Sequence, residues 1–436
     1  MPCVRTPCLA LLLLTVVSPA IAAEFVQQPF RPIDERAAAA AGVRKLEGKH
    51  SVLYTDLPSA PSVDEFPAVF DLAFPQWCKY FGQDAVLLDG WKARGFVIRD
   101  KALFQRLGLL PNTLPSFPHG YTLGNEFWLY EQPGDYYTRH LVLHEGTHSF
   151  MFTVLGSCGP PWYMEGIAEM LATHRWRGDR LEMNWFPERK EDVPYLGRIK
   201  IVRDAYDARK AKSLQAVLDY GPEAHRETEP YAWCWALAAM LDGDPRYRDR
   251  FRALPQQVRR GDFTRHFLAQ LGPDADALAA QWQVYICELE YGADVARTAI
   301  DFAPGKPLPS GGTRASIAAD CGWQNTGVRL EAGVEYRVRA HGRYQIADQP
   351  RPWPCEPNGV SIRYYRGRPL GILLGAVCPD LPLNGACPMI APSTIGLDRT
   401  LAPKQTGTLF LRVNDSNAEL GDNKGDLTVE IERQSP

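Results

Sequence analysis

Five consecutive residues, His144 to His148, combine the residue types of a hydrolytic metal centre with the spacing that it requires. Positions i and i+4 of a helix lie on the same face, so His144 and His148 can direct two imidazoles at one point. Glu145 lies next to them, where its carboxylate can act as a base on a metal-bound water. Apolar residues on both sides of the motif predict a buried helix, in which these polar side chains need partners such as a metal ion. The alternative is an exposed helix whose histidines bind nothing.

A second segment with carboxylates, Trp162 to Glu169, follows after a stretch rich in Gly and Pro. Such a stretch favours a reversal of the chain, and Pro161 is well suited to the first turn of the next helix. Two antiparallel helices joined in this way would place Glu165 opposite the histidine pair. Glu169 lies one turn beyond Glu165 on the same helix face, and the alternative for Glu169 is a solvated helix residue.

The motif HEGTH, sixteen intervening residues and then the Glu of WYMEGIAE resemble the gluzincin-type zinc metallopeptidases. The resemblance implies an α+β zincin-like metallopeptidase domain with a zinc ion bound by His144, His148 and Glu165. It implies Glu145 as the general base on the zinc-bound water. It also implies that Glu169 hydrogen-bonds a ligand imidazole, which fixes the ring tautomer and strengthens the ligand.

Peptide hydrolysis also needs a donor for the oxyanion that forms when water attacks the carbonyl. Aminopeptidase-like gluzincins carry a tyrosine near the start of a helix after the third ligand, which makes Tyr231 the candidate here and His225 the second choice. The alternative for Tyr231 is a core or capping residue. In zincins the strand before the zinc helix is commonly the sheet edge that pairs with substrate, which implies that Phe127–Tyr130 line the cleft. The alternative is an ordinary core strand.

The first 23 residues do not have the pattern of a helix or strand of a folded domain. Arg5 is followed by an apolar run, Leu9–Val17, and then by small residues. This pattern predicts a secretory signal peptide, and hence a secreted or periplasmic protein, with no second apolar run of membrane-spanning length. Of the other eight cysteines, four lie in the first part of the chain and four in the last. Even numbers in an exported protein predict two disulfides in each part, with the pairing open and buried free thiols as the alternative. A net charge of −3 gives no indication of a nucleic-acid partner.

The pattern of elements predicts two domains. We expect the metallopeptidase domain at 24–300, with strands near 50–56, 95–99 and 125–130 and helices near 37–41, 63–81, 199–220, 230–241, 245–254 and 274–290. Residues 301–312 have the composition of a linker. From 313 to 436 the chain shows short alternating segments separated by Gly, Asn and Pro, which predict an all-β sandwich.

The loop Asn414–Gly425 carries several oxygen side chains and two glycines between two predicted strands, as a calcium site requires. The stretches LRVNDSNAELGDNKGDLTVEI and LEAGVEYRVRAHGRY resemble the calcium-dependent galactose-binding lectins of bacteria. The resemblance implies Asp415, Asp422 and Asn423 as side-chain ligands of calcium and the carbonyl of Glu419 as another. The other sugar-contacting residues of those lectins have no counterpart here, and the alternative is a polar turn that binds nothing.

Together these features predict a secreted zinc-dependent peptidase that acts on a protein or peptide substrate. The β-sandwich would be an accessory domain that binds calcium and could also bind a glycan. The alternative is a carbohydrate-binding protein whose zincin domain is a scaffold or hydrolyses something other than peptides. The intact HEGTH motif and Glu165 favour the enzyme, because a scaffold needs neither.

Overall fold

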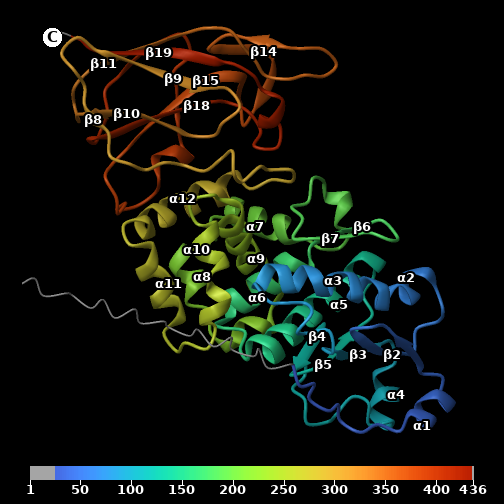
Figure 1. Ribbon diagram of the computed structural model, residues 1–436. Helices are drawn as coiled ribbons and strands as arrows, with labels where there is room; N and C mark the ends of the chain where they lie inside the picture. The colour runs from blue at the N-terminus through green and yellow to red at the C-terminus, as the bar shows by residue number, and fades with distance from the viewer. Residues whose placement is uncertain (1–24, 435–436) are drawn as a thin grey trace, which may run out of the picture.

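The computed structural model describes residues 25–434, apart from the side chains of His225 and Arg226. The chain forms an N-terminal part that mixes helices with strands and a C-terminal part built mainly from strands (Figure 1). The architecture is therefore α+β followed by a sheet-rich region. The predicted signal peptide lies outside the described residues. Among the helices between 25 and 434, none has the length and apolar character needed to cross a membrane.

The N-terminal sheet has five strands in the order β1-β2-β3-β5-β4, with β2, β3 and β5 parallel and the two outer strands antiparallel to their neighbours. Their bounds are β1 Arg44–Glu47, β2 Ser51–Thr55, β3 Ala93–Ile98, β4 Gly120–Leu123 and β5 Glu126–Tyr130. Side chains alternate between the two faces. Phe127 and Leu129 of β5 join the core around α3 and α5, whereas Trp128 packs with Ala38 of α1 and Phe104 of α4 on the other face.

The position of β5 in this sheet differs from the expectation that Phe127–Tyr130 form the sheet edge. Strand β4 pairs with β5 and forms the edge, so the prediction was wrong and β5 is a buried interior strand. A two-residue turn, Gly124-Asn125, joins β4 to β5, and Gly124 has the positive φ of 60° that this tight turn requires. A Gly-Asn pair between two β-rich segments is a hairpin signal that could have identified β4 from the sequence.

Helices α3 and α5 cover one face of this sheet and α1 and α4 the other, and the later helices form a separate helical layer (Figure 1). The predicted helix at 199–220 is interrupted between α7 and α8, where Arg209 takes a left-handed conformation and Ser213 caps the next helix. Helices α6 and α9 pack closely, because Gly166 has no side chain to separate them: a Cβ there would lie 2.8 Å from the carbonyl oxygen of Cys234. The helices and the small hairpin are α1 Glu35–Ala40, α2 Pro61–Asp64, α3 Phe66–Phe81, α4 Lys101–Arg106, α5 Asp135–Phe150, α6 Pro161–Ala172, β6 His174–Trp176, β7 Leu181–Met183, α7 Arg198–Asp207, α8 Leu214–Leu218, α9 Thr228–Gly243, α10 Arg248–Arg252, α11 Phe263–Leu271 and α12 Asp274–Glu288.

Two antiparallel-rich sheets make up the C-terminal part. One has the order β14-β15-β18-β10-β8 with β16 beside β15, and the other has the order β17-β11-β19-β9. Alternate residues of β18 and β19, such as Leu411 and Val429, meet in one apolar core between the sheets. The strands are β8 Lys306–Pro307, β9 Thr313–Ala318, β10 Gln324–Leu330, β11 Tyr336–His341, β14 Asn358–Tyr365, β15 Arg368–Cys378, β16 Ser393–Thr394, β17 Asp398–Leu401, β18 Gly407–Val413 and β19 Asp426–Arg433, with a further short pair at β12 Tyr344–Gln345 and β13 Pro354–Cys355.

The C-terminal end of α12 binds the C-terminal part through two glutamates. Arg412 donates to both carboxylate oxygens of Glu288 at 2.8 Å. The Glu290 carboxylate accepts from the Ser416 hydroxyl at 2.8 Å and the Asn417 backbone N–H at 2.7 Å. The loop predicted to bind calcium is therefore also a docking element between the two parts of the chain.

All eight cysteines between residues 25 and 434 are free thiols, so the disulfides expected from their even numbers are not present in the structure. Cys78, Cys158 and Cys234 are buried in the N-terminal core on separate elements and pack as small apolar side chains. Cys378 and Cys387 lie together in the apolar cluster that α12 shares with the C-terminal part. The alternative of buried free thiols describes most of these residues.

Candidate metal centre

Helix α5 carries the HEGTH motif in the core, where its rotation is fixed by contacts with α3. A Cβ at Gly146 would lie 2.6 Å from the Phe70 ring, so only glycine allows the two helices to approach this closely. On the same face Trp77 donates to the Thr147 hydroxyl at 2.9 Å, and that hydroxyl donates to the Leu143 carbonyl at 2.8 Å. With this face held against α3, His144 and His148 point away from it, toward α6.

The side chains of His144, His148 and Glu165 converge on one point. His148 Nε2 lies 3.1 Å from His144 Nε2 and 3.2 Å from Glu165 Oε2, and His144 Nε2 lies 3.3 Å from the same oxygen. All three side chains are buried. Two imidazole nitrogens this close repel each other if both present lone pairs, so the arrangement requires a proton or a cation between them. The structure thus brings together the three residues predicted as zinc ligands.

Glu169 lies behind His144, where the resemblance implies a carboxylate that hydrogen-bonds a ligand imidazole, and it contacts the ring at ion-pair distance. Its carboxylate lies 3.3 Å from His144 Nδ1 and 3.3 Å from His140 Nε2, and it accepts two hydrogen bonds from Arg198 at 2.7 and 2.8 Å. Burial disfavours the charged carboxylate, but Arg198 outweighs this effect and holds the pKa of Glu169 well below its ordinary range. Burial likewise opposes protonation of His144, but the Glu165 and Glu169 carboxylates outweigh it and raise the pKa of the imidazole to about 10.

His140 and Arg198 were not predicted from the sequence. His140 lies one turn before His144 on α5, so a third histidine at i−4 was a signal for it. Arg198 lies on α7 and carried no local signal. His140, His144 and Glu169 also have donor atoms close enough to hold a cation. Because the two oxygens of Glu169 are already engaged by Arg198, the site with Glu165 is the better metal centre.

Glu145 is held against the edge strand β4. Thr122 donates its hydroxyl to Glu145 Oε2 at 2.7 Å and lies 3.1 Å from the Glu145 carbonyl oxygen. The other carboxylate oxygen fits over Gly120, where a Cβ would collide with it. Burial raises the pKa of Glu145, which makes this carboxylate a stronger base than an exposed one. Thr122 and Gly120 were missed because the sequence interpretation did not identify β4.

Tyr231 lies in the first turn of α9, with its ring centroid 5.9 Å from that of His144. The Arg198 guanidinium lies 5.7 Å from the centre of the Tyr231 ring. Burial raises the pKa of the Tyr231 hydroxyl far above its ordinary value, so this phenol stays protonated and can donate a hydrogen bond. The structure places Tyr231 beside the metal centre, and the His225 side chain lies outside the described residues.

The four residues predicted to bind calcium lie in one loop of the C-terminal part. Asp415 is fully buried, and its carboxylate accepts from Asn423 Nδ2 at 2.9 Å and from the Ser416 backbone N–H at 2.7 Å. Oδ1 of Asp422 and Oδ1 of Asn423 are buried without a hydrogen-bond partner. The Glu419 side chain points elsewhere and pairs with an arginine, which is consistent with a role only for its carbonyl. The buried Asp415 carboxylate and the unpartnered oxygens of Asp422 and Asn423 belong to one loop, and oxygen groups of this kind suit a hard cation.

Comparisons with known proteins do not identify the chain. No family model matches it, and no curated protein sequence matches it. Among solved structures, a domain described as "EclA N-terminal domain; PllA-like lectin" matches 28% of this chain and 95% of its own length, with 22% sequence identity and a TM-score of 0.22. At this TM-score the similarity establishes neither a shared fold nor a shared function, and the function must be argued from the site.

Proposed function

We propose that the N-terminal domain is a zinc-dependent hydrolase of the gluzincin type that cleaves peptide bonds. The observation that carries the proposal is the triangle formed by His144 Nε2, His148 Nε2 and Glu165 Oε2, with sides of 3.1, 3.2 and 3.3 Å. Ligands at about 2.0–2.1 Å on one face of a tetrahedral zinc ion lie about 3.3–3.4 Å apart. The donor types and the size of the triangle both fit zinc.

A zinc ion held by these three residues would supply a Lewis acid for the scissile carbonyl and lower the pKa of a water molecule to about 7. Glu145 takes the proton from the attacking water, because its carboxylate is buried and poorly solvated. A hydrogen bond from the Thr122 hydroxyl fixes the orientation of this carboxylate. The same carboxylate then gives the proton to the leaving amine. Tyr231 remains protonated and donates to the oxyanion.

Strand β4 supports a peptide as the substrate. It is the last strand of its sheet, so one row of its backbone groups is open to pair with an extended chain. Thr122 and Gly120, which contact Glu145, belong to this strand. A peptide added to the edge would therefore run past the general base.

The experiment is zinc analysis of the purified chain combined with casein hydrolysis, for the wild type and three variants. We expect about one zinc per chain in the wild type, loss of zinc and activity in Glu165→Ala, and loss of activity with retained zinc in Glu145→Gln. Glu182→Gln changes an exposed glutamate on β7 and serves as the control with normal zinc content and activity. Near-normal turnover by Glu145→Gln, or a wild type without zinc, would contradict the proposal.

A second candidate function is calcium-dependent glycan binding by the C-terminal part, with or without peptidase activity. It is supported by the buried Asp415 carboxylate, which contacts Asn423, and by the unpartnered oxygens of Asp422 and Asn423 in the same loop. Calcium titration followed calorimetrically, for the wild type and Asp415→Asn, tests the cation site. A glycan array with and without a calcium chelator then tests the sugar. Binding that persists in the chelator would count against a calcium-dependent lectin.

A further inference from the structure

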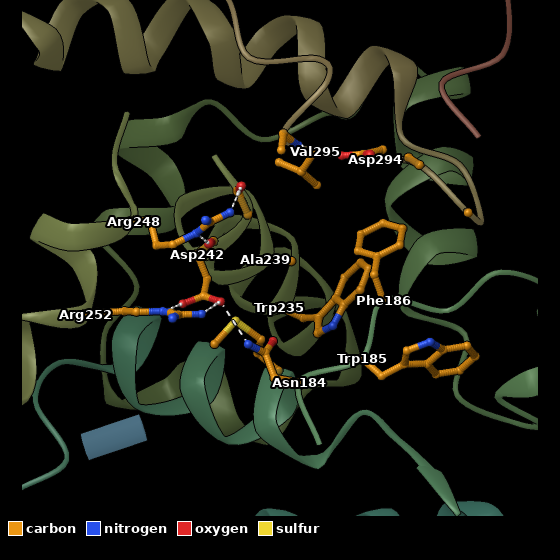
Figure 2. A pocket seen from close by; sticks show the side chains of 15 residues that line it. Asn184, Trp185, Phe186, Trp235, Ala239, Asp242, Arg248, Arg252, Asp294 and Val295 are labelled. Atoms are coloured by element: carbon orange, nitrogen blue, oxygen red, sulfur yellow. Dashed lines mark hydrogen bonds and ion pairs between the residues drawn. The ribbon is translucent and has the colours of Figure 1, made fainter. Parts of the chain in front are cut away.

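A cavity of about 470 Å³ lies on the side of the helical layer that faces the C-terminal part, and none of the residues of the metal centre line it. Its walls come from α6, α9 and α10, the segment after β7 and the segment Gly292–Ala296 that leads toward the C-terminal part (Figure 2). The aromatic and polar side chains in its lining include Asn184, Trp185, Phe186, Trp235, Asp242 and Arg252. This volume is within the range of small-ligand sites in proteins.

One wall of the cavity is aromatic. Phe186 and Trp235 lie side by side with ring centroids 5.6 Å apart, and Trp185, which precedes Phe186 in the chain, lies apart from that pair (Figure 2). Arg175 stacks on the Trp185 ring at 4.3 Å, which holds this half-buried side chain in place. The backbone at Asn184 has a φ of 52°, a left-handed conformation that asparagine tolerates better than most residues. Large apolar faces are thus presented to the cavity from a fixed segment.

The other wall is polar, and its charges are paired. The Asp242 carboxylate accepts from Arg252 Nε and Nη2 at 2.7 and 2.9 Å and from Asn184 Nδ2 at 2.8 Å. Arg248 donates through Nε and Nη2 to the carbonyls of Asp242 and Gly243 at the end of α9. Figure 2 shows both guanidinium groups turned toward Asp242. These hydrogen bonds use Nε and Nη2 of each arginine and Nδ2 of Asn184, which leaves Nη1 of both arginines and Oδ1 of Asn184 to serve a ligand.

We propose that this cavity binds a pyranose residue of a glycan. A pyranose has apolar C–H faces that pack on aromatic rings and a rim of hydroxyls that both donate and accept hydrogen bonds, which matches the two walls. A multiply charged anion would meet the Asp242 carboxylate, and the neighbouring guanidinium groups are already paired with acceptors. A purely apolar ligand would leave the polar wall without partners, which is unfavourable.

The cavity and the metal centre share two helices. Trp235 lies one turn after Tyr231 on α9, and Met170 follows Glu169 on α6. A chain that holds a glycan at the cavity while the metal centre acts on attached polypeptide would have this layout. The combination of glycan binding with cleavage of the attached polypeptide rests on the proposed function. The proposal that the cavity binds a pyranose does not.

Saturation-transfer NMR and tryptophan fluorescence on the full chain test the proposal, with chitotriose, cellotriose, maltotriose and galactobiose as probes. We expect at least one probe to bind, with a loss of affinity of about tenfold or more in Trp185→Ala and in Asn184→Gly. Tyr364→Ala removes an exposed aromatic side chain on β14, far from the cavity lining, and should bind as the wild type does. Asp415→Asn is measured alongside and reports any sugar that is held by the C-terminal loop.

Three results would overturn the proposal: no probe bound at about 10 mM, binding unaffected by Trp185→Ala, or binding lost only in Asp415→Asn. The last result would assign the sugar to the C-terminal loop. Because the assay measures binding and requires no turnover, a chain that binds sugar but does not cleave casein would contradict the proposed function and leave this site intact. A chain with normal peptidase activity and no bound sugar would do the reverse.

Discussion

Replacement of Arg198 by methionine should strongly destabilise the N-terminal part of the protein. Arg198 donates two hydrogen bonds to Glu169, and the two side chains are only 6% and 1% exposed. Methionine fills much of the space of the arginine but leaves the Glu169 carboxylate buried without its cation. The two imidazoles that also face Glu169 cannot compensate, because burial lowers the pKa of His140 and because His144 is a proposed metal ligand.

Removing one partner of a buried ion pair typically costs about 3–5 kcal/mol, since the remaining charge is left in a poorly polarisable environment. For a domain of roughly this size, each kcal/mol lowers the melting temperature by about 2–4 °C, so the expected decrease is roughly 6–20 °C. Glu169 also orients His144, and loss of such a partner usually weakens metal binding by about 10–100-fold. Both quantities are measured on the same preparation, by thermal unfolding and by competition with a zinc chelator.

The chain offers a matched control in Arg252. Its guanidinium makes the same bidentate contact with Asp242, at 2.7 and 2.9 Å, but the Arg252 side chain is 46% exposed. The Asp242 carboxylate, which is 7% exposed, also accepts hydrogen bonds from Asn184 and Tyr80. Arg252→Met should therefore cost clearly less than Arg198→Met, about 1–2 kcal/mol, because two donors to the carboxylate remain. The double variant Arg198→Met/Glu169→Gln should regain over half of the stability lost in Arg198→Met, because it removes the buried charge. Equal losses in the two single variants, or no recovery in the double variant, would refute the reasoning.

Three further changes test other contacts. Gly120→Ala should displace Glu145 and lower peptidase activity by about tenfold or more while zinc content stays normal; reduced zinc content would instead show that β4 supports the metal ligands. Gly166→Ala should cost about 1–3 kcal/mol in chemical unfolding, since the new methyl group presses on the Cys234 carbonyl between α6 and α9; an unchanged unfolding midpoint would mean that the two helices separate freely. Burial raises the pKa of Asp415 from 3.8 to about 6, so the folded chain keeps a proton that the unfolded chain releases. Without calcium, the free energy of unfolding should therefore fall as the pH rises from about 4 to 6, by up to about 3 kcal/mol. Asp415→Asn should lack this component, and added calcium should suppress it; identical pH profiles for the variant and the wild type would be inconsistent with the buried carboxylate.

Much of the metal centre could be predicted because its geometry is local. His144, Glu145 and His148 share one helix, and the Gly-Pro break before α6 makes the approach of Glu165 a short-range event. Arg198 could not be predicted, because it reaches Glu169 from a helix 29 residues away in the chain and nothing in its neighbours marks the contact. The order of the strands in the N-terminal sheet could not be predicted either. It depends on which strands pair, and the hydrophobic pattern of a single strand does not specify its partners.

Strand β15 shows the same limit in the C-terminal part. It is the longest strand of the C-terminal part, yet it is not among the segments whose alternating or β-rich character predicted strands, which are 328–330, 336–340, 360–364, 409–413 and 427–431. Alternation was the signal for those strands, and β15 has almost none because both of its faces are covered. Leu373 packs in the core between the sheets, whereas Leu374 packs in the cluster that α12 shares with this part. Because α12 covers the outer face of β15, both faces of this strand are apolar, and its sequence lacks the alternation that predicts a strand.

The charges around the metal centre provide an argument for a divalent cation that is independent of ligand geometry. Three buried carboxylates, Glu145, Glu165 and Glu169, face one buried guanidinium, Arg198, so with neutral imidazoles the site carries a net charge of about −2. Uncompensated buried charge is strongly unfavourable, and without a metal the chain can offset it only in part, by protonation of His144 and by a raised pKa of Glu145. A dication balances the charge and displaces that proton. A bound metal ion of charge +2 would therefore explain why the three carboxylates, the guanidinium and the imidazoles are all buried in one place, which a folded core would otherwise avoid.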